Sequence, residues 1–170
     1  KNPSRIFHVV QAVRQAVPTP TPVTAKIRLG YSHKELHLEI AQAVEAGGAQ
    51  SITVHARTRD EFYRPPAHWE YLASIRESVP IPVTANGDIW SLEDFKKCRS
   101  ISGCHHFALG RPLISTPDLA RQIKNDINEY NDHGHHDDNT KRDPSLRWID
   151  IQKIWIPFFL EKNQSDYGDS

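Results

Sequence analysis

Hydrophobic positions along residues 1–125 alternate between helical spacing and short continuous runs. Residues 4–17 place five apolar side chains at helical spacing, which predicts an amphipathic helix. Short apolar runs bounded by Pro and Gly predict strands at 22–28, 50–55, 81–85 and 104–109. Between and after the strands the helical pattern returns, from residue 33, at 68–78, at 92–100 and from residue 117. Ser32 and Glu35 have the spacing of a capping box for the second helix.

Each predicted strand ends in polar residues of kinds that bind anionic groups. They are Lys26 and Arg28, His55 and Arg57, Asn86–Gly87–Asp88, and Gly110–Arg111. Lys26 to His55 is 29 positions and His55 to Asn86 is 31, the length of a strand, a crossover helix and two loops. We therefore predict an α/β fold in which these groups meet at the carboxyl ends of parallel strands. A complete TIM (β/α)8 barrel needs about 250 residues, so we expect half of one, with about four parallel strands and their helices.

Charge and cysteine content exclude several classes of protein. The 170 residues have a formal net charge of zero, with +4 over residues 1–111 and −4 over residues 112–170, which is not the basic stripe of a self-sufficient RNA binder. Cys98 and Cys104 make no disulfide framework or zinc signature, as is typical of a reducing cytoplasm. We expect no signal peptide and no membrane span. Because the sequence contains no Met, we expect a fragment or a late-starting gene product.

The polar residues have structural explanations as well as chemical ones. An unpaired Lys26 or Arg28 is costly in a buried strand, so one of them is expected to reach an anion or an ion-pair partner. A single His at a strand end is commonly structural, but His55 has two further donors close by in Lys26 and Arg57. Asn-Gly is common in turns, and Gly also lets the backbone approach a ligand closely. Arg111 follows the last predicted strand, where barrels commonly bind phosphate.

Other chemistry-bearing residues are expected to be structural. Cys104 begins the strand that Gly110 ends, which puts the thiol at the far end of the barrel. Cys98 lies within a helix, so we expect two buried structural thiols. The His and Asp side chains of residues 133–138 match no closed metal site, and we predict a polar loop without a metal. Tryptophan rings can stack on bases, but we expect core packing for Trp69 and Trp155 and a more open position for Trp90, directly after Asp88.

Four stretches, taken in order, resemble the tRNA-dihydrouridine synthase family. They are 22–30, 54–58, 81–88 and 109–111. Gly87-Asp88-Ile89-Trp90 and the Tyr63–Arg64 pair resemble the bacterial class C branch, which acts on uridine 16. The resemblance implies the C-terminal half of a TIM barrel followed by part of a helical domain. The implied division is an FMN-binding half-barrel at 1–125, a flexible polar loop at 126–145 and a partial helical tRNA-binding region at 146–170.

The resemblance also implies a flavoenzyme in which NADPH-reduced FMN reduces uridine to 5,6-dihydrouridine in the tRNA D loop. Lys26 and His55 would contact the isoalloxazine. The ribityl chain and phosphate would be held by Asn86, Gly87, Asp88, Gly110 and Arg111. Arg57 would be catalytic, close to the flavin or the uracil. RNA would be bound by Arg59, Tyr63 and Arg64.

The sequence departs from the family in one important respect. The family's proton-donating cysteine belongs to an Asn-x-Gly-Cys-Pro motif that does not occur here, so we expect the chain to be inactive alone. The full-length protein is expected to be a cytoplasmic monomer without a metal. Two alternatives remain: another FMN-dependent TIM-barrel oxidoreductase acting on a small pyrimidine, and a non-catalytic RNA-binding fragment. The Tyr63–Arg64 loop and the aromatic residues of 146–160 favour an RNA substrate.

Overall fold

The computed structural model describes residues 2–132, and residues 1–129 form a compact unit. The strands are β1 (Thr24–Gly30), β2 (Ser51–Thr58), β3 (Val83–Asn86) and β4 (His106–Ala108). The helices are α1 (Pro3–Ala16), α2 (His37–Ala46), α3 (Glu70–Ser78), α4 (Leu92–Ser102), α5 (Pro112–Ser115) and α6 (Leu119–Asp132). Among these residues no helix is both long and apolar enough to cross a membrane.

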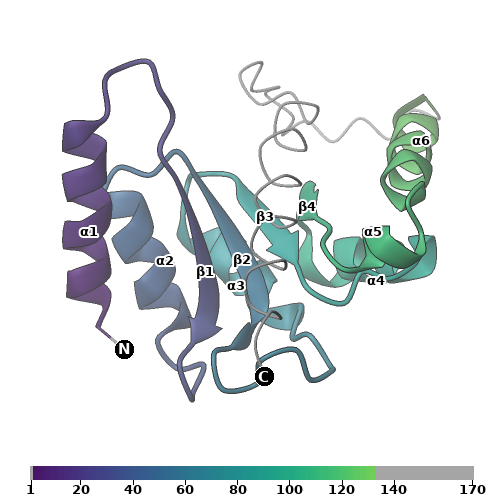
Figure 1. Ribbon diagram of the computed structural model, residues 1–170, viewed down its shortest axis with the longest axis horizontal. Helices are drawn as coiled ribbons and strands as arrows, with labels where there is room; N and C mark the ends of the chain where they lie inside the picture. The colour runs from purple at the N-terminus through teal and green to yellow at the C-terminus, as the bar shows by residue number, and fades with distance from the viewer. Residues whose placement is uncertain (1, 133–170) are drawn as a thin grey trace, which may run out of the picture. The chain divides into compact units, whose positions relative to one another are not determined.

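The strands of the described residues form one parallel sheet in the order β1-β2-β3-β4 (Figure 1). The register aligns Arg28 with His55 and His55 with Asn86. Because all neighbouring strands are parallel, their carboxyl ends lie at one edge of the sheet. Strands that alternate with helices and pair in sequence order form a partial TIM barrel, so the predicted fold is confirmed.

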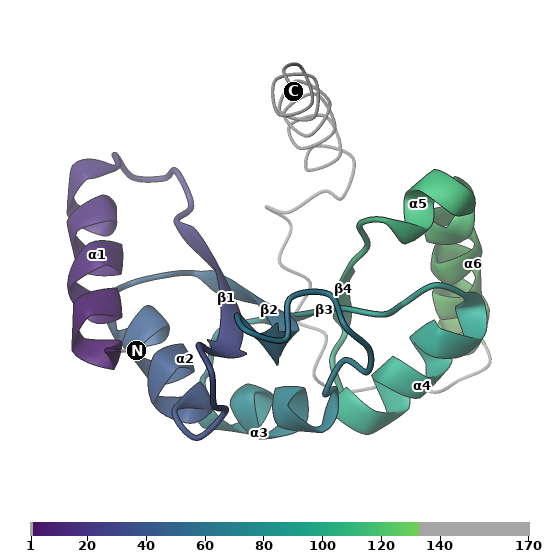
Figure 2. The same ribbon diagram turned by 60° about the horizontal axis from the view of Figure 1, so that its bottom comes forward.

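One face of the sheet is covered by helices. Figure 2 shows α2, α3 and α4 in an arc along this face, where α2 contacts β1 and β2, and α3 contacts β2 and β3. The strand residues that point to the helices belong to a single hydrophobic core: Leu29, Ile52, Val54, Val83, Ala85 and Phe107, with Ala25 and Ile27 packed against it. Alternate residues point the other way, to a face that no helix within residues 2–132 covers.

The start of α4 is formed as the sequence predicts, and the start of α2 is not. Ser91 caps α4 by accepting a hydrogen bond from the Asp94 amide at 3.1 Å, and the Asp94 carboxylate accepts from the Trp90 amide at 3.0 Å. The predicted capping box at Ser32 is wrong, because α2 begins at His37. Ser32 instead donates to the Asp60 carboxylate at 2.6 Å, which ties two loops of the carboxyl edge together.

Two further boundaries differ from the predicted ones. Strand β2 continues to Thr58, because Thr58 pairs with Gly30 beyond a bulge in β2, so Arg57 lies in a strand and not in the predicted loop. Helix α6 continues to Asp132, so residues 126–132 of the predicted polar loop are helical. The apolar spacing of Ile123 and Ile127 extends this helix onto the core. Residues 133–170, with the His-rich segment and the predicted helical region, lie outside the described residues.

Candidate functional site

Three of the predicted site residues meet on the uncovered face at the carboxyl ends of β1, β2 and β3. Lys26 donates from Nζ to Asn86 Oδ1 at 3.0 Å, so the bond passes over β2 and links β1 to β3. Asn86 in turn donates from Nδ2 to the Ala108 carbonyl at 2.8 Å, which fixes the direction of its amide. His55 lies between Arg28 and Asn86 in the register. The sheet therefore presents two cations, an amide and an imidazole from adjacent strands.

The accumulated positive charge changes the ionisation of this group. Burial of its ammonium, and then the charge of Arg28, lower the pKa of Lys26. Burial, followed by the charges of Arg28 and Lys26, lowers the pKa of His55 to about 4. The imidazole is therefore neutral near pH 7. A neutral ring avoids adding a third positive charge to an already cationic face.

Arg57 is the most deeply buried charged residue of the site. Its side chain is 0% exposed and contacts three partners. Nε donates to the Arg64 carbonyl at 2.6 Å, and one terminal nitrogen pairs with Asp88. The other terminal nitrogen lies 3.2 Å from His55 Nε2. Since a guanidinium only donates, Nε2 is the acceptor, and the proton of the neutral imidazole is on Nδ1.

Asp88 connects the loop after β3 to the loop after β2. Its carboxylate accepts from Arg57 and from the Ala67 amide at 2.8 Å. Burial by itself raises the pKa of Asp88, but the bond from Arg57 and the charge of Arg57 outweigh it and hold the pKa below its usual range. The backbone here is unusual, because Asp88 has a φ of 54°. Loop strain of this kind requires strong local contacts, which the Arg57 pair supplies.

Gly87 is required by the same packing. Its φ is 122°, and a Cβ added there would lie 3.1 Å from His55 Cδ2 and 3.2 Å from Ala67 Cβ. The Gly87 carbonyl accepts from Trp69 Nε1 at 2.8 Å. The Asn-Gly turn thus allows the loop to press against His55. Gly110 differs, since a Cβ there would meet no atom within 4 Å.

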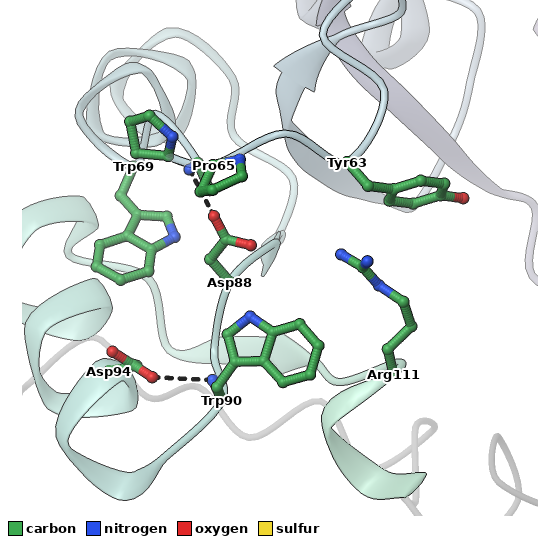
Figure 3. A pocket seen from close by; sticks show the side chains of 9 residues that line it. Tyr63, Pro65, Trp69, Asp88, Trp90, Asp94 and Arg111 are labelled. Carbon is green, nitrogen blue, oxygen red and sulfur yellow. Dashed lines mark hydrogen bonds between the residues drawn. The ribbon is translucent and has the colours of Figure 1, made fainter. Parts of the chain in front are cut away.

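Tyr63 joins Arg111 to residues of β1 and β2. The Arg111 guanidinium lies over the Tyr63 ring, 4.5 Å from its centroid, and 5.2 Å from that of Trp90 (Figure 3). The Tyr63 ring also contacts two residues of the sheet. Its centroid lies 5.6 Å from the Arg28 guanidinium and 5.9 Å from the centroid of the His55 ring. A single aromatic side chain therefore lies among all three groups. Such contacts between guanidinium and ring stabilise both partners.

A family model described as dihydrouridine synthase (Dus) matches residues 1–143. The chain belongs to the dihydrouridine synthase family. Its members are enzymes of the oxidoreductase class, as the sequence motifs predict.

Three relatives refine this assignment. The tRNA-dihydrouridine(16) synthase of Neisseria meningitidis serogroup A is 55% identical over 124 residues, which cover 73% of this chain and 37% of the relative. That of Aquipseudomonas alcaligenes is 52% identical over 123 residues, covering 72% and 39%. That of Shewanella oneidensis is 49% identical over 128 residues, covering 75% and 41%. The chain thus spans about two fifths of the length of its relatives, and the predicted resemblance to the class C branch is confirmed.

In this dihydrouridine synthase chain, the predicted RNA-binding residues lie on the loop between β2 and α3. Tyr63 is 57% exposed. The Arg59 guanidinium lies 5.4 Å from the Tyr31 ring centroid and 5.0 Å from that of Phe62. Arg64 donates to the Asp60 carbonyl at 2.9 Å, within the loop. The loop therefore presents arginine and aromatic side chains at the edge where Lys26, His55 and Asn86 meet.

Glu61 anchors that loop, and sequence reasoning missed it. Its carboxylate accepts from Lys34 Nζ at 2.5 Å, from the Thr58 amide at 2.6 Å and is 3.0 Å from His68 Nε2. For Arg28 an anion or an ion-pair partner is the expectation from sequence, and its guanidinium donates instead to the Thr58 carbonyl at 2.8 Å. A Glu three residues after a Thr at a strand end was the available signal. Nothing local in the sequence indicated its contact with Lys34, 27 positions away.

Both cysteines of this family member are buried, as predicted. Cys98 lies in α4, and burial raises its pKa to about 12. Burial also raises the pKa of Cys104, which follows the left-handed Gly103 that ends α4. Cys104 precedes β4, whereas Arg111 follows it, so the thiol lies toward the opposite end of the sheet from the site. Neither thiol has the exposure or the lowered pKa of a reactive cysteine.

Proposed function

We propose that this chain forms the FMN-holding half of a tRNA-dihydrouridine synthase, which reduces uridine to 5,6-dihydrouridine in the D loop of cytoplasmic tRNA at the expense of NADPH. The observation that carries this proposal is the convergence of Lys26, His55 and Asn86 at the carboxyl ends of three adjacent strands. In α/β barrels, ligands and reacting groups lie at that edge. The relatives' names favour tRNA over a free pyrimidine as the substrate.

The chemistry of these side chains fits FMN. Lys26 supplies a positive charge, while Asn86 and neutral His55 supply hydrogen-bonding groups for the edge of a planar heterocycle. The backbone at Gly110 is open, and Arg111 follows it, which suits a phosphate group. We assign Lys26 and His55 to the isoalloxazine. The ribityl chain and phosphate are assigned to Asn86, the backbone of Gly87 and Asp88, Gly110 and Arg111.

The chain's own residues bind and orient in this scheme. The bound flavin supplies the hydride for the uracil ring. Lys26, held by Asn86, directs a donor toward the electron-rich edge of the flavin. His55 keeps its ring neutral and its proton on Nδ1, because Arg57 occupies Nε2. Since the Arg57 guanidinium is fully buried, we assign it a positioning role through His55 and Asp88 in place of direct contact with substrate.

The proton donor is a separate matter. The family resemblance implies a cysteine in an Asn-x-Gly-Cys-Pro motif, and the sequence contains no such motif. Cys98 and Cys104 are buried thiols with raised pKa values, so neither suits the role. We therefore propose that the 170-residue chain binds FMN without reducing tRNA. Arg59, Tyr63 and Arg64 are proposed to contact the RNA.

Flavin binding tests this proposal directly. The purified 170-residue chain is titrated into FMN, and quenching of flavin fluorescence is recorded. Saturable binding is expected, and Lys26→Met is expected to weaken it about tenfold or more, as for loss of a hydrogen bond to a charged group. Lys97→Met, at an exposed cation of α4, is the matched control and should bind as the unmodified chain does. No saturable binding, or equal binding by Lys26→Met, contradicts the proposal.

A further inference from the structure

A cavity of about 480 Å³ lies beside the candidate cofactor site, between the loop after β2 and the loop after β3 (Figure 3). Its walls are mostly planar and apolar: Tyr63, Pro65, Pro66, Trp69 and Trp90. Polar groups line it as well, from Asp88, Asp94 and Arg111. This volume is in the range of small-molecule sites in proteins, which combine apolar walls with a few fixed polar groups.

The aromatic walls of the cavity are held in place and partly open to solvent. Trp69 donates from Nε1 to the Gly87 carbonyl at 2.8 Å, so one wall is fixed to the loop after β3. Trp90 is 42% exposed, and its backbone amide donates to the Asp94 carboxylate at 3.0 Å. A large ring that is exposed on an anchored backbone is suited to stacking, because little further ordering of the loop is needed on binding.

The charges around the cavity restrict what it binds. Two carboxylates, Asp88 and Asp94, line the inside and disfavour a phosphate or an acidic peptide there. The Arg111 guanidinium lies over the rings of Tyr63 and Trp90, so a second cation in the cavity would meet a like charge. A neutral, planar group with N–H donors at its edge meets neither objection. Nucleobases combine a π face for the rings with such donors for carboxylates.

We propose that this cavity binds one unstacked nucleobase of a single-stranded RNA segment, with the base stacked on Trp90 and its N–H edge toward Asp88 and Asp94. This inference rests on the proposed function, since it names a contact of the RNA beside the nucleoside that is reduced. Trp90 belongs to the loop after β3, so it adds a contact that the Arg59–Arg64 loop alone does not provide.

Anisotropy of a fluorescein-labelled, single-stranded RNA of mixed sequence, titrated with the 170-residue chain, tests the proposal. Trp90→Ala is expected to weaken RNA binding about tenfold, because stacking one base contributes about 1–3 kcal/mol. Trp90→Phe, which keeps a ring, should recover most of the affinity. Ile101→Ala is the control, since Ile101 is an apolar side chain of α4 that is 49% exposed and does not line the cavity. Thermal unfolding of each variant establishes that it is folded.

The outcomes separate this inference from the proposed function. RNA binding that is unchanged in Trp90→Ala, or that no chain shows, overturns the inference whatever the flavin titration gives. Competition by guanosine monophosphate that is lost in Trp90→Ala supports a nucleobase site. If guanosine monophosphate competes as strongly as unlabelled RNA does, the ligand of the cavity is a free nucleotide and not an RNA segment. FMN binding is expected to be equal in Trp90→Ala and the unmodified chain. If both FMN and RNA binding fall together, Trp90 serves the cofactor site and the inference is wrong.

Discussion

The two faces of the sheet are made from alternate residues of the same strands, yet they are stabilised in different ways. The helix-covered face is apolar, with Ile52, Val54 and Ala85 at 0% exposure. The uncovered face carries Lys26, His55 and Asn86, where a hydrogen bond joins Lys26 to Asn86 across β2 and His55 accepts from Arg57. Burial of apolar area stabilises the first face without regard to direction. The second depends on specific partners, because each buried polar group is costly without one.

The comparison indicates where binding chemistry is possible on this sheet. An apolar face that is closed by α2, α3 and α4 has no open groups for a ligand. The polar face holds Lys26 and Asn86 in fixed directions and leaves them accessible to a ligand, with the largely buried His55 between them in the register. Its rigidity comes from Arg57 and Asp88, which lie behind the open residues and connect two loops. Substitutions on the two faces should therefore have separable effects on folding and on binding.

The largest expected loss follows from removing the centre of the polar network. Asp88→Ala leaves the Arg57 guanidinium at 0% exposure without its carboxylate. Breaking a buried ion pair in this way costs about 3–5 kcal/mol, and the free energy of unfolding in urea should fall by that amount. Asp118→Ala, at an exposed carboxylate next to Arg121, is the control and should change little.

The reverse substitution sharpens this test. Arg57→Met leaves Asp88, whose side chain is 17% exposed and lines the cavity, where water reaches it. Its loss should be smaller than that of Asp88→Ala, because a carboxylate at an opening is hydrated and a buried guanidinium is not. Equal losses from the two variants would contradict the view that burial of Arg57 makes the pair essential.

Much of this architecture was accessible from the sequence, because its periodic parts are local. Apolar runs and crossover lengths of 29 and 31 positions predict the parallel strands, and residues after each strand predict the edge where they gather. The confirmed cap at Ser91 is equally local, since its partner Asp94 is three residues away. These features depend on neighbouring residues and on the strand period alone.

Contacts between distant loops were not accessible in the same way. From sequence Ser32 is predicted to cap a helix, but in the fold its hydroxyl donates a hydrogen bond to Asp60, 28 positions later. Arg57 reads as a residue that reaches substrate until the fold brings Asp88 and the Arg64 carbonyl to it. In both cases a polar side chain has several satisfactory partners, and only the assembled loops select one. Sequence therefore indicates which residues gather, and less well which of them touch one another.

A smaller loss is expected from crowding the turn between the two regions. Gly87→Ala places a methyl group about 3.1 Å from His55 Cδ2 at a φ of 122°. A strained backbone of this kind costs about 1–3 kcal/mol, and the displaced imidazole should also weaken FMN binding. Gly110→Ala is the control for stability alone, because no protein atom lies within 4 Å of a Cβ there, whereas FMN binding involves Gly110 itself. A Gly87→Ala chain with normal urea stability and normal FMN titration would show that the loop adjusts freely.

Neighbouring residues of β2 compare the faces most directly. Ile52→Val removes one buried methylene from the covered face and should cost about 0.5–1.5 kcal/mol of unfolding free energy. Thr53→Val alters the adjacent residue on the uncovered face, where a change within about 0.5 kcal/mol is expected. Urea titrations of the two variants measure both values. If Thr53→Val lowered the free energy of unfolding more than Ile52→Val does, the polar face would contribute more to folding than the covered face at this position of β2.

Acid should reveal the smallest effect, at the loop that borders the polar face. Burial alone raises the pKa of Glu61, but the hydrogen bond from Lys34, then those from Thr58, and the charge of Lys34 outweigh it and lower the pKa to about 2. A carboxyl group with a lowered pKa stabilises the fold above its unfolded value near 4.5, and this contribution is lost as pH falls from there toward 2. His55, with a pKa of about 4, acts in the window above, between its ordinary 6.5 and 4, where the unfolded chain takes up the proton first. The midpoint of thermal unfolding should therefore fall in two stages on acidification, and Glu61→Gln should flatten only the lower one.

Because Glu61 is partly exposed and screened by solvent, its stage should be the shallower of the two. A Glu61→Gln chain whose unfolding midpoint keeps the same slope below pH 4.5 would mean that the loop is held by its other contacts, with Arg57 and Arg28 as its principal anchors.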